Sequence, residues 1–220
     1  MPEQYRLGVM RFASENGMAG LSFRVAEIIR KDTGVSWYGA LYPHPQFKVD
    51  YDIDEALVWA ISRQESGFNP RAKSRAKAAG LMQLMPATAS FIARDRGYRG
   101  RKRHQLFEPE LNLRLGQTYI QHLLDEPLVE SSLIRLLAAY NGGPGNLRKW
   151  LGKVDHQDDP FLLVESMPAR ETRYYVKNVI SNLGIYRQRF GETTPALSGL
   201  AAGNGGKFVP SEATDKGLAN

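Results

Sequence analysis

The sequence predicts an all-α fold with at most a minor β excursion. From residue 52 to residue 190, apolar residues recur at helical spacing almost throughout. The alternation of β-branched and polar residues that is typical of strands is nearly absent. A short β segment between residues 70 and 82 is compatible with the sequence but is not required by it. The length of 220 residues suits one domain with appendages.

The first 45 residues predict a short helical region ahead of the main domain. Residues 5–31 are expected to form two short helices around a break that contains Gly17 and Gly20, although Gly8 weakens the first helix. Residues 33–51 contain two prolines, two glycines and five aromatic residues. They predict an irregular connector that packs against the rest of the chain.

The main domain is expected to extend from residue 46 to residue 190. Asp54 is expected to cap the start of a helix that Gly67 and Pro70 end. Pro86 is expected in the first turn of the next helix, which Gly97 stops. Further helices are expected at residues 109–125, 131–140 and 171–190.

The composition changes at Gly191, where the chain becomes rich in Gly, Ala, Ser and Thr. Residues 191–220 are therefore expected to form a flexible tail. The predicted organisation is thus a helical segment at 1–45, a main domain at 46–190 and a tail at 191–220.

Charge and cysteine content restrict the chemistry that is available. The chain has 29 Lys and Arg against 23 Asp and Glu, a net charge of +6, which points to an anionic partner. The lack of cysteine excludes disulfides, thiolate nucleophiles and Cys-ligated zinc. The four histidines lack the spacing of metal ligands, so no metal and no cofactor are expected.

Glu65 is the first candidate for chemistry. On a helix it shares one face with Leu57 and Ile61, where loss of solvent would raise its pKa and favour the protonated acid. Such a group can donate a proton to a leaving oxygen. The alternative is that Glu65 ends its helix at the surface, paired with Arg63 or Arg71.

Two further segments carry polar groups in apolar, glycine-rich surroundings. Gln83 lies in the apolar stretch 80–89, where its amide must either bond backbone groups or face a ligand. Tyr140 lies where a predicted helix meets the glycine-rich segment 141–145. Asn141 and Gly142 could simply cap that helix, but a cap alone does not account for the position of Tyr140.

Four motifs together resemble the catalytic domain of the soluble lytic murein transglycosylases. They are ESGFNP at 65–70, GLMQLMP at 80–86, AYNGGPG at 139–145 and ESMP with ETRYYV between 165 and 176. The motifs occur in the order and spacing of that family, and the resemblance covers about residues 45–190. Residues 1–45 resemble the end of the helical superhelix that precedes this domain in larger members.

The resemblance implies a goose-lysozyme-like fold and cleavage of the β-1,4 bond between N-acetylmuramic acid and N-acetylglucosamine, leaving a 1,6-anhydro ring on muramic acid. It implies that Glu65 is the single catalytic acid and base. Between Glu65 and Asp95 the chain has no acidic residue, which suits an internal nucleophile better than a second carboxylate. The substrate-binding residues that it implies are Ser74, Gln83, Met85, Tyr140, Asn141, Glu171 and Glu165.

The basic run at 94–103 is either a solvated loop or a contact for anionic envelope polymers. No nucleic-acid motif accompanies it, so the expected partners are peptidoglycan glycan strands and not nucleic acid. We expect a monomer, in the periplasm or peripherally associated with the cell envelope. The N-terminus does not show the pattern of a signal peptide, so the protein is either cytoplasmic or a piece of a longer chain, and the resemblance favours a piece of an envelope protein. The alternative functions are a lysozyme-type muramidase that hydrolyses the same bond and a non-catalytic murein-binding module.

Overall fold

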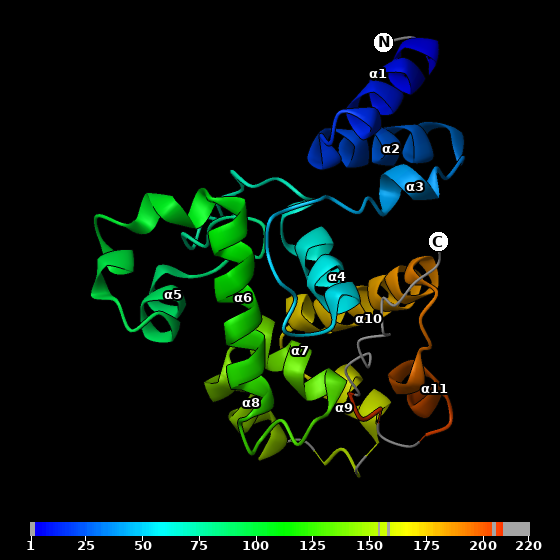
Figure 1. Ribbon diagram of the computed structural model, residues 1–220. Coiled ribbons are helices and arrows are strands. Elements are labelled where there is room, and N and C mark those ends of the chain that lie inside the picture. Colours follow the sequence, from blue (N-terminus) through cyan, green and yellow to red (C-terminus); the bar gives the residue numbers. More distant parts are fainter. Residues whose placement is uncertain (1–2, 154, 158, 204–205, 209–220) are drawn as a thin grey trace, which may run out of the picture. The chain divides into compact units, whose positions relative to one another are not determined.

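The computed structural model describes residues 3–153, 155–157, 159–203 and 206–208. Within this part of the chain the regular elements are helices, and β structure is limited to isolated bridges. The all-α fold predicted from the sequence is therefore confirmed (Figure 1). No helix among the described residues combines the length and the apolar character that crossing a membrane requires.

The chain divides into two compact units, with divisions after residues 50, 60 and 118. The second and third divisions lie inside helices α4 (Glu55–Ser66) and α6 (Pro109–Leu124). The first unit comprises residues up to 50 together with 61–118. The second comprises residues 51–60 together with the chain from 119 onward. The division of the sequence at residues 45 and 190 stays a prediction.

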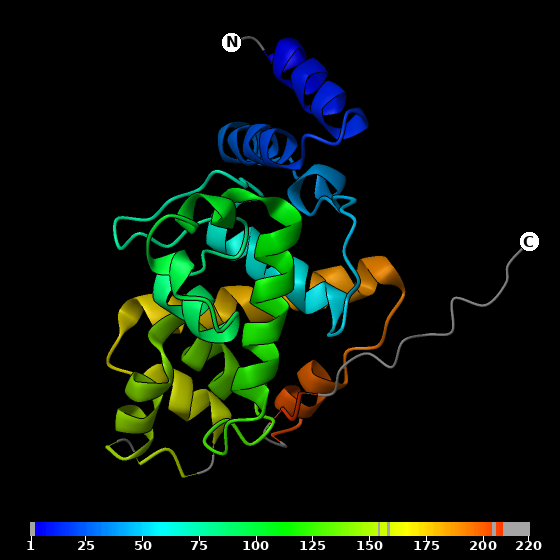
Figure 2. The ribbon, with the colours of Figure 1, turned by 60° about the vertical axis from the view of Figure 1, so that its left-hand side comes forward.

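The first unit begins with three helices, α1 (Glu3–Glu15), α2 (Ala19–Thr33) and α3 (Tyr38–Leu41). Helices α1 and α2 pack against each other, as both views show (Figures 1 and 2). Helix α2 ends at Gly34, whose φ of 76° suits glycine and whose N–H bonds the carbonyl oxygen of Arg30. The connector expected at 33–51 begins one residue later, because Thr33 ends α2, and it contains the short helix α3. Its first part is exposed at Trp37 and Tyr38, and burial begins at Ala40, so only part of the connector packs as predicted.

The rest of the first unit runs from residue 61 within α4 to residue 118 within α6. The β excursion expected near residues 70–82 is limited to the bridges Lys73–Ala79 and Ala79–Leu84. Helix α5 (Pro86–Ile92) begins at its proline as predicted, and the 3₁₀ helices η1 (Arg96–Arg99) and η2 (Arg103–Phe107) follow it.

The prediction that Gly97 stops α5 is wrong. The helix ends at Ile92, and Gly97 lies within η1. Arg94 then takes a φ of 50°, and the side chain of Asp95 caps η1 by accepting a hydrogen bond from the N–H of Gly97. The chain therefore leaves the α conformation before the glycine is reached.

The second unit contains the helices α7 (Leu133–Gly142), α8 (Pro144–Leu151), α9 (Pro160–Ser166), α10 (Arg170–Phe190) and α11 (Pro195–Ala201). Helix α7 packs against both α8 and α10. Its buried residues and those of α10 form much of the core of this unit. The sequence pattern did not predict α8 and α9, because helices of eight and seven residues are too short to show a clear period.

The flexible tail expected from residue 191 is corrected for its first part. Helix α11 lies there with Ala196 and Leu200 buried, and the N–H of Phe208 donates to the carbonyl oxygen of Ser131. A Cβ atom at Gly184 on α10 would come within 2.7 Å of Leu197 Cδ1, so α11 packs closely on α10. Gly184, a glycine of α10 and not of the expected tail, leaves room for this contact. Residues 209–220 lie outside the described part of the chain.

Candidate functional site

Helix α4 presents Glu65 in its last turn. The carboxylate of Asp54 accepts a hydrogen bond from the N–H of Leu57 at 3.2 Å, so the predicted N-cap is confirmed. Leu57 and Ile61 are fully buried, and Glu65 is half-buried on the same stripe of the helix. The helix stops immediately afterwards, because Gly67 takes a φ of 55°. The carboxyl group is thus carried at the junction between a buried helix and a turn.

The segment from residue 72 to residue 85 is held by hydrogen bonds from its own side chains. The amide nitrogen of Gln83 donates to the carbonyl oxygens of Ala72 at 3.0 Å and Gly80 at 2.8 Å. The sequence left open whether this amide bonds backbone groups or faces a ligand, and in the structure its nitrogen bonds backbone groups. The hydroxyl oxygen of Ser74 accepts a hydrogen bond from the N–H of Ala78 at 3.0 Å. Met85 is 39% exposed at the start of α5.

Asn112, which the sequence analysis missed, holds this segment from α6. Its side-chain oxygen accepts a hydrogen bond from the N–H of Met82 at 2.8 Å, and its side-chain nitrogen donates to the backbone carbonyl oxygens of Ala79 and Leu106. It is fully buried. The available signal was an asparagine amid the leucines of PELNLRL, because a buried amide must find partners.

The second unit brings the third and fourth motifs together. Asn141 on α7 accepts a hydrogen bond from the hydroxyl of Thr172 on α10 at 2.7 Å. The ring of Tyr140 lies parallel to that of Tyr175, with centroids 6.5 Å apart, and 5.3 Å from the ring of Tyr119. Helix α7 continues through Gly142, so Asn141 lies in the helix and does not cap it.

The two late glutamates are on the surface. Glu171 is exposed in the first turn of α10, where a carboxylate suits the positive end of the helix dipole. Glu165 is also exposed, and its carboxylate pairs with the ammonium group of Lys177. The eight candidate residues are divided between the two units. The first unit holds Glu65, Ser74, Gln83 and Met85, and the second holds Tyr140, Asn141, Glu165 and Glu171.

Two perturbed groups lie near these motifs. Burial raises the pKa of Tyr119, so its hydroxyl stays protonated beside Tyr140 across the ordinary pH range. In the basic run, the hydrogen bond from Lys102 and then the N–H of Gly97 hold the pKa of Asp95 below its usual value. The basic run is therefore tied into η1 and η2 by an ion pair of 2.7 Å. Among the described residues, no group of three or more His, Asp or Glu side chains could hold a metal ion.

Comparison with known proteins matches the model of the transglycosylase SLT domain to residues 46–161. The soluble lytic murein transglycosylase of Salmonella typhimurium is 41% identical over 150 residues, which are 67% of this chain and 23% of that protein. A membrane-bound lytic murein transglycosylase C from Photorhabdus laumondii is 34% identical over 61% of this chain and 43% of its own length. The chain therefore spans less than a quarter of the length of the soluble relatives that it matches.

Solved structures of lytic transglycosylases are also similar to this chain. The 70 kDa soluble lytic transglycosylase of Escherichia coli superposes with a TM-score of 0.73 at 32% identity, covering 85% of this chain and 31% of that chain. A complex of the 70 kDa soluble lytic transglycosylase with bulgecin A reaches a TM-score of 0.76 at 31% identity, over 88% and 32% of the two chains. An inactive variant of the Pseudomonas aeruginosa lytic transglycosylase, with one glutamate replaced by glutamine, matches at 30% identity and a TM-score of 0.73, over 86% and 31%.

Proposed function

The chain belongs to the transglycosylase SLT domain family, and from that premise we propose that it is a peptidoglycan lytic transglycosylase. The substrate is the glycan strand of the cell wall. The bond cleaved is the β-1,4 linkage between N-acetylmuramic acid and N-acetylglucosamine. The observation that carries the proposal is the placement of Glu65, half-buried in the last turn of α4 within the matched region.

In the proposed reaction Glu65 acts first as an acid and then as a base. It protonates the glycosidic oxygen, the bond to C1 of muramic acid breaks, and the N-acetyl group stabilises the positive sugar carbon. The ionised Glu65 then accepts the proton of the C6 hydroxyl as that oxygen bonds to C1, which closes the 1,6-anhydro ring. No water is consumed. The hydroxyl belongs to the same sugar, so its high effective concentration replaces an external nucleophile.

The remaining candidate residues are proposed to bind the glycan. The bonds from Gln83 to Ala72 and Gly80 fix the segment that carries Ser74 and Met85. In the second unit, the Asn141–Thr172 bond and the tyrosine stack support the roles proposed for Tyr140, Asn141, Glu171 and Glu165. The relatives are named soluble and membrane-bound lytic murein transglycosylases, so we propose that this chain acts in the periplasm or cell envelope. That it acts as a monomer is a separate proposal.

The proposal is tested by replacing Glu65 with glutamine, which keeps the shape of the side chain but removes the acid. We expect the release of anhydromuropeptides from purified cell-wall sacculi to fall by at least about 10²–10⁴-fold, the usual contribution of a positioned acid and base. Circular dichroism should show an unchanged fold. Glu108→Gln, a matched change at an exposed glutamate on the same unit, should leave the rate unchanged.

Mass spectrometry of the products separates the alternatives. An anhydro end supports the transglycosylase, whereas a reducing end that is heavier by one water identifies a muramidase hydrolase. Binding to sacculi without any product would identify a non-catalytic murein-binding module. Full activity of Glu65→Gln would contradict the role of this residue.

A further inference from the structure

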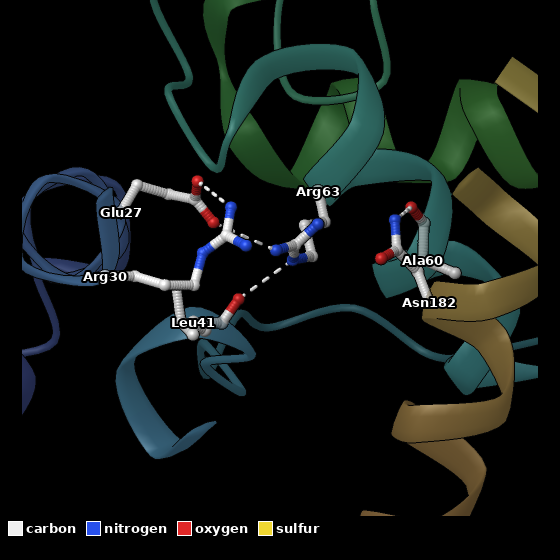
Figure 3. Close-up of polar contacts among 6 residues, drawn as sticks. All are labelled: Glu27, Arg30, Leu41, Ala60, Arg63 and Asn182. Atoms are coloured by element: carbon white, nitrogen blue, oxygen red, sulfur yellow. Dashed lines mark hydrogen bonds and ion pairs between the residues drawn. The ribbon is translucent and has the colours of Figure 1, made fainter. Parts of the chain in front are cut away.

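Arg63 connects three elements of the first unit. Its Nε donates to the carbonyl oxygen of Leu41 on α3 at 2.9 Å, and one terminal nitrogen lies 3.4 Å from the carboxylate of Glu27 on α2 (Figure 3). Its guanidinium also lies 4.3 Å from the ring centroid of Tyr42 and 4.9 Å from that of Phe23. With only 15% of the side chain exposed, Arg63 is enclosed by these partners.

Helix α2 also contacts the turn that follows α4. A Cβ atom at Gly20 would lie 2.8 Å from the carbonyl oxygen of Phe68, and a Cβ atom at Gly67 would lie 2.8 Å from the ring of Phe23. The rings of Phe23 and Phe68 meet edge to face with centroids 5.5 Å apart. Two glycines thus allow close packing between α2 and the backbone just beyond Glu65.

The need for such an attachment follows from where Glu65 lies. The last turn of a helix has unpaired carbonyl groups and frays readily, and the negative end of the helix dipole disfavours a carboxylate there. Arg63 precedes Glu65 by two residues, so the two side chains leave the helix on different sides. Arg63 can therefore hold this turn from a side of the helix that Glu65 does not occupy. Its positive charge also offsets the negative end of the helix dipole.

We propose that Arg63 is a positioning residue for Glu65. Through their contacts with Arg63, α2 and α3 help to hold the last turn of α4, which carries Glu65. The inference rests on the proposed function for its kinetic consequence, but its structural part can be tested separately. A misplacement of about 1 Å in a reacting group can cost about 10²-fold in rate. Removal of Arg63 should therefore lower kcat and leave KM nearly unchanged.

The experiment compares Arg63→Ala, Glu27→Gln and Arg63→Lys with the parent chain. Release of anhydromuropeptides is measured against substrate concentration, at a temperature where circular dichroism shows every variant folded. We expect kcat to fall roughly 10- to 100-fold in Arg63→Ala and less in Glu27→Gln. Lysine keeps the charge but lacks the planar fork and the stacking surface, so it should restore kcat only in part.

Hydrogen exchange supplies a measurement that does not depend on activity. The N–H of Gly67 bonds the carbonyl oxygen of Arg63, and the N–H of Asn69 bonds that of Ser66, so both amides report on the turn. Their exchange should become faster in Arg63→Ala, while exchange in α10 stays as in the parent. Arg11→Ala is the matched control, because it removes an arginine of the same unit from an ion pair with Glu15 while 81% of its side chain is exposed. It should change neither kcat nor exchange.

Both measurements must move together if Arg63 positions Glu65. Faster exchange with an unchanged kcat would make Arg63 a purely structural residue and overturn the inference, as would unchanged exchange in all three variants. If Arg63→Ala does not fold, Glu27→Gln decides by the same criteria. If the parent chain releases no anhydromuropeptides, the proposed function fails, and exchange at Gly67 and Asn69 alone decides whether Arg63 holds the turn.

Discussion

Asp54 combines two roles in a single buried carboxylate. It caps α4 through the N–H of Leu57 and also accepts hydrogen bonds from the guanidinium of Arg187, 133 residues later. Asp54 is fully buried, and 1% of the Arg187 side chain is exposed. Arg187 donates in addition to the carbonyl oxygen of Thr193 at 3.1 Å. The ion pair therefore links the start of α4 to the end of α10 within the second unit.

Replacing Arg187 with methionine tests this pair. The substitution keeps much of the side-chain volume but leaves a buried carboxylate without its counter-charge, so we expect the free energy of unfolding to fall by about 3–5 kcal/mol. Urea unfolding followed by circular dichroism measures the change. Arg148→Met, at an exposed arginine on α8, should change it by no more than about 0.5 kcal/mol. A loss below about 1 kcal/mol for Arg187→Met would mean that the pair contributes little.

At the level of elements, the segment from residue 72 to residue 85 depends on its neighbours for its shape. It has two isolated bridges and no strand, so little repetitive backbone pairing stabilises it. Asn112 supplies three bonds to it and to the end of η2, and a Cβ atom at Gly80 would collide with the Asn112 side chain. The conformation of the segment with Ser74, Gln83 and Met85 therefore depends on its hydrogen bonds to helix α6.

Asn112→Ala should loosen this segment while α6 itself persists. The substitution removes the bonds to the N–H of Met82 and to the carbonyl oxygens of Ala79 and Leu106, of which the Ala79 oxygen keeps its bond from the N–H of Leu84. Each buried group that is left unsatisfied costs about 1–3 kcal/mol. We expect a loss of at least about 2 kcal/mol in unfolding free energy and a raised KM for glycan strands. Asn178→Ala, at an exposed asparagine on α10, is the control. An unchanged KM would separate the segment from substrate binding.

At the scale of the whole molecule, the net charge of +6 affects which partners the chain attracts and does not determine its fold. The basic run at 94–103 is built into η1 and η2, with Arg96, Arg99 and Arg101 exposed. These charges are therefore available to an anionic polymer, such as a cell wall with peptide carboxylates. Exposed charges are screened over about 8 Å at physiological ionic strength, so this attraction should depend on salt.

We expect the Glu65→Gln chain to bind sacculi less tightly as salt rises, in a pelleting assay. Removing three exposed charges by Arg96→Gln, Arg99→Gln and Arg101→Gln should weaken binding further and flatten the salt dependence. A control that removes three exposed charges from α1 and α2, by Arg11→Gln, Arg24→Gln and Lys31→Gln, tests position against net charge. Equal losses in both triple variants would assign the effect to net charge alone, and binding that is insensitive to salt would contradict both.

Four features can be predicted from the sequence alone: the helical class, the N-cap at Asp54, the placement of Glu65 on an apolar stripe and the helix start at Pro86. Each of these depends on residues a few positions apart, through helical period, capping or the fixed φ of proline. The family motifs added the candidate site, because their order and spacing are also readable along the chain.

The partners of Arg63, Asn112 and Arg187 could be identified only once the fold was known. Their contacts join residues that are distant in sequence. The leucines around Asn112 can indicate that it is buried, but no local pattern identifies the partners of any of the three. The same holds for α11, where packing on α10 outweighs a glycine-rich composition that favours a tail. Local spacing thus set which groups could react, whereas long-range burial and hydrogen bonding set how firmly they are held.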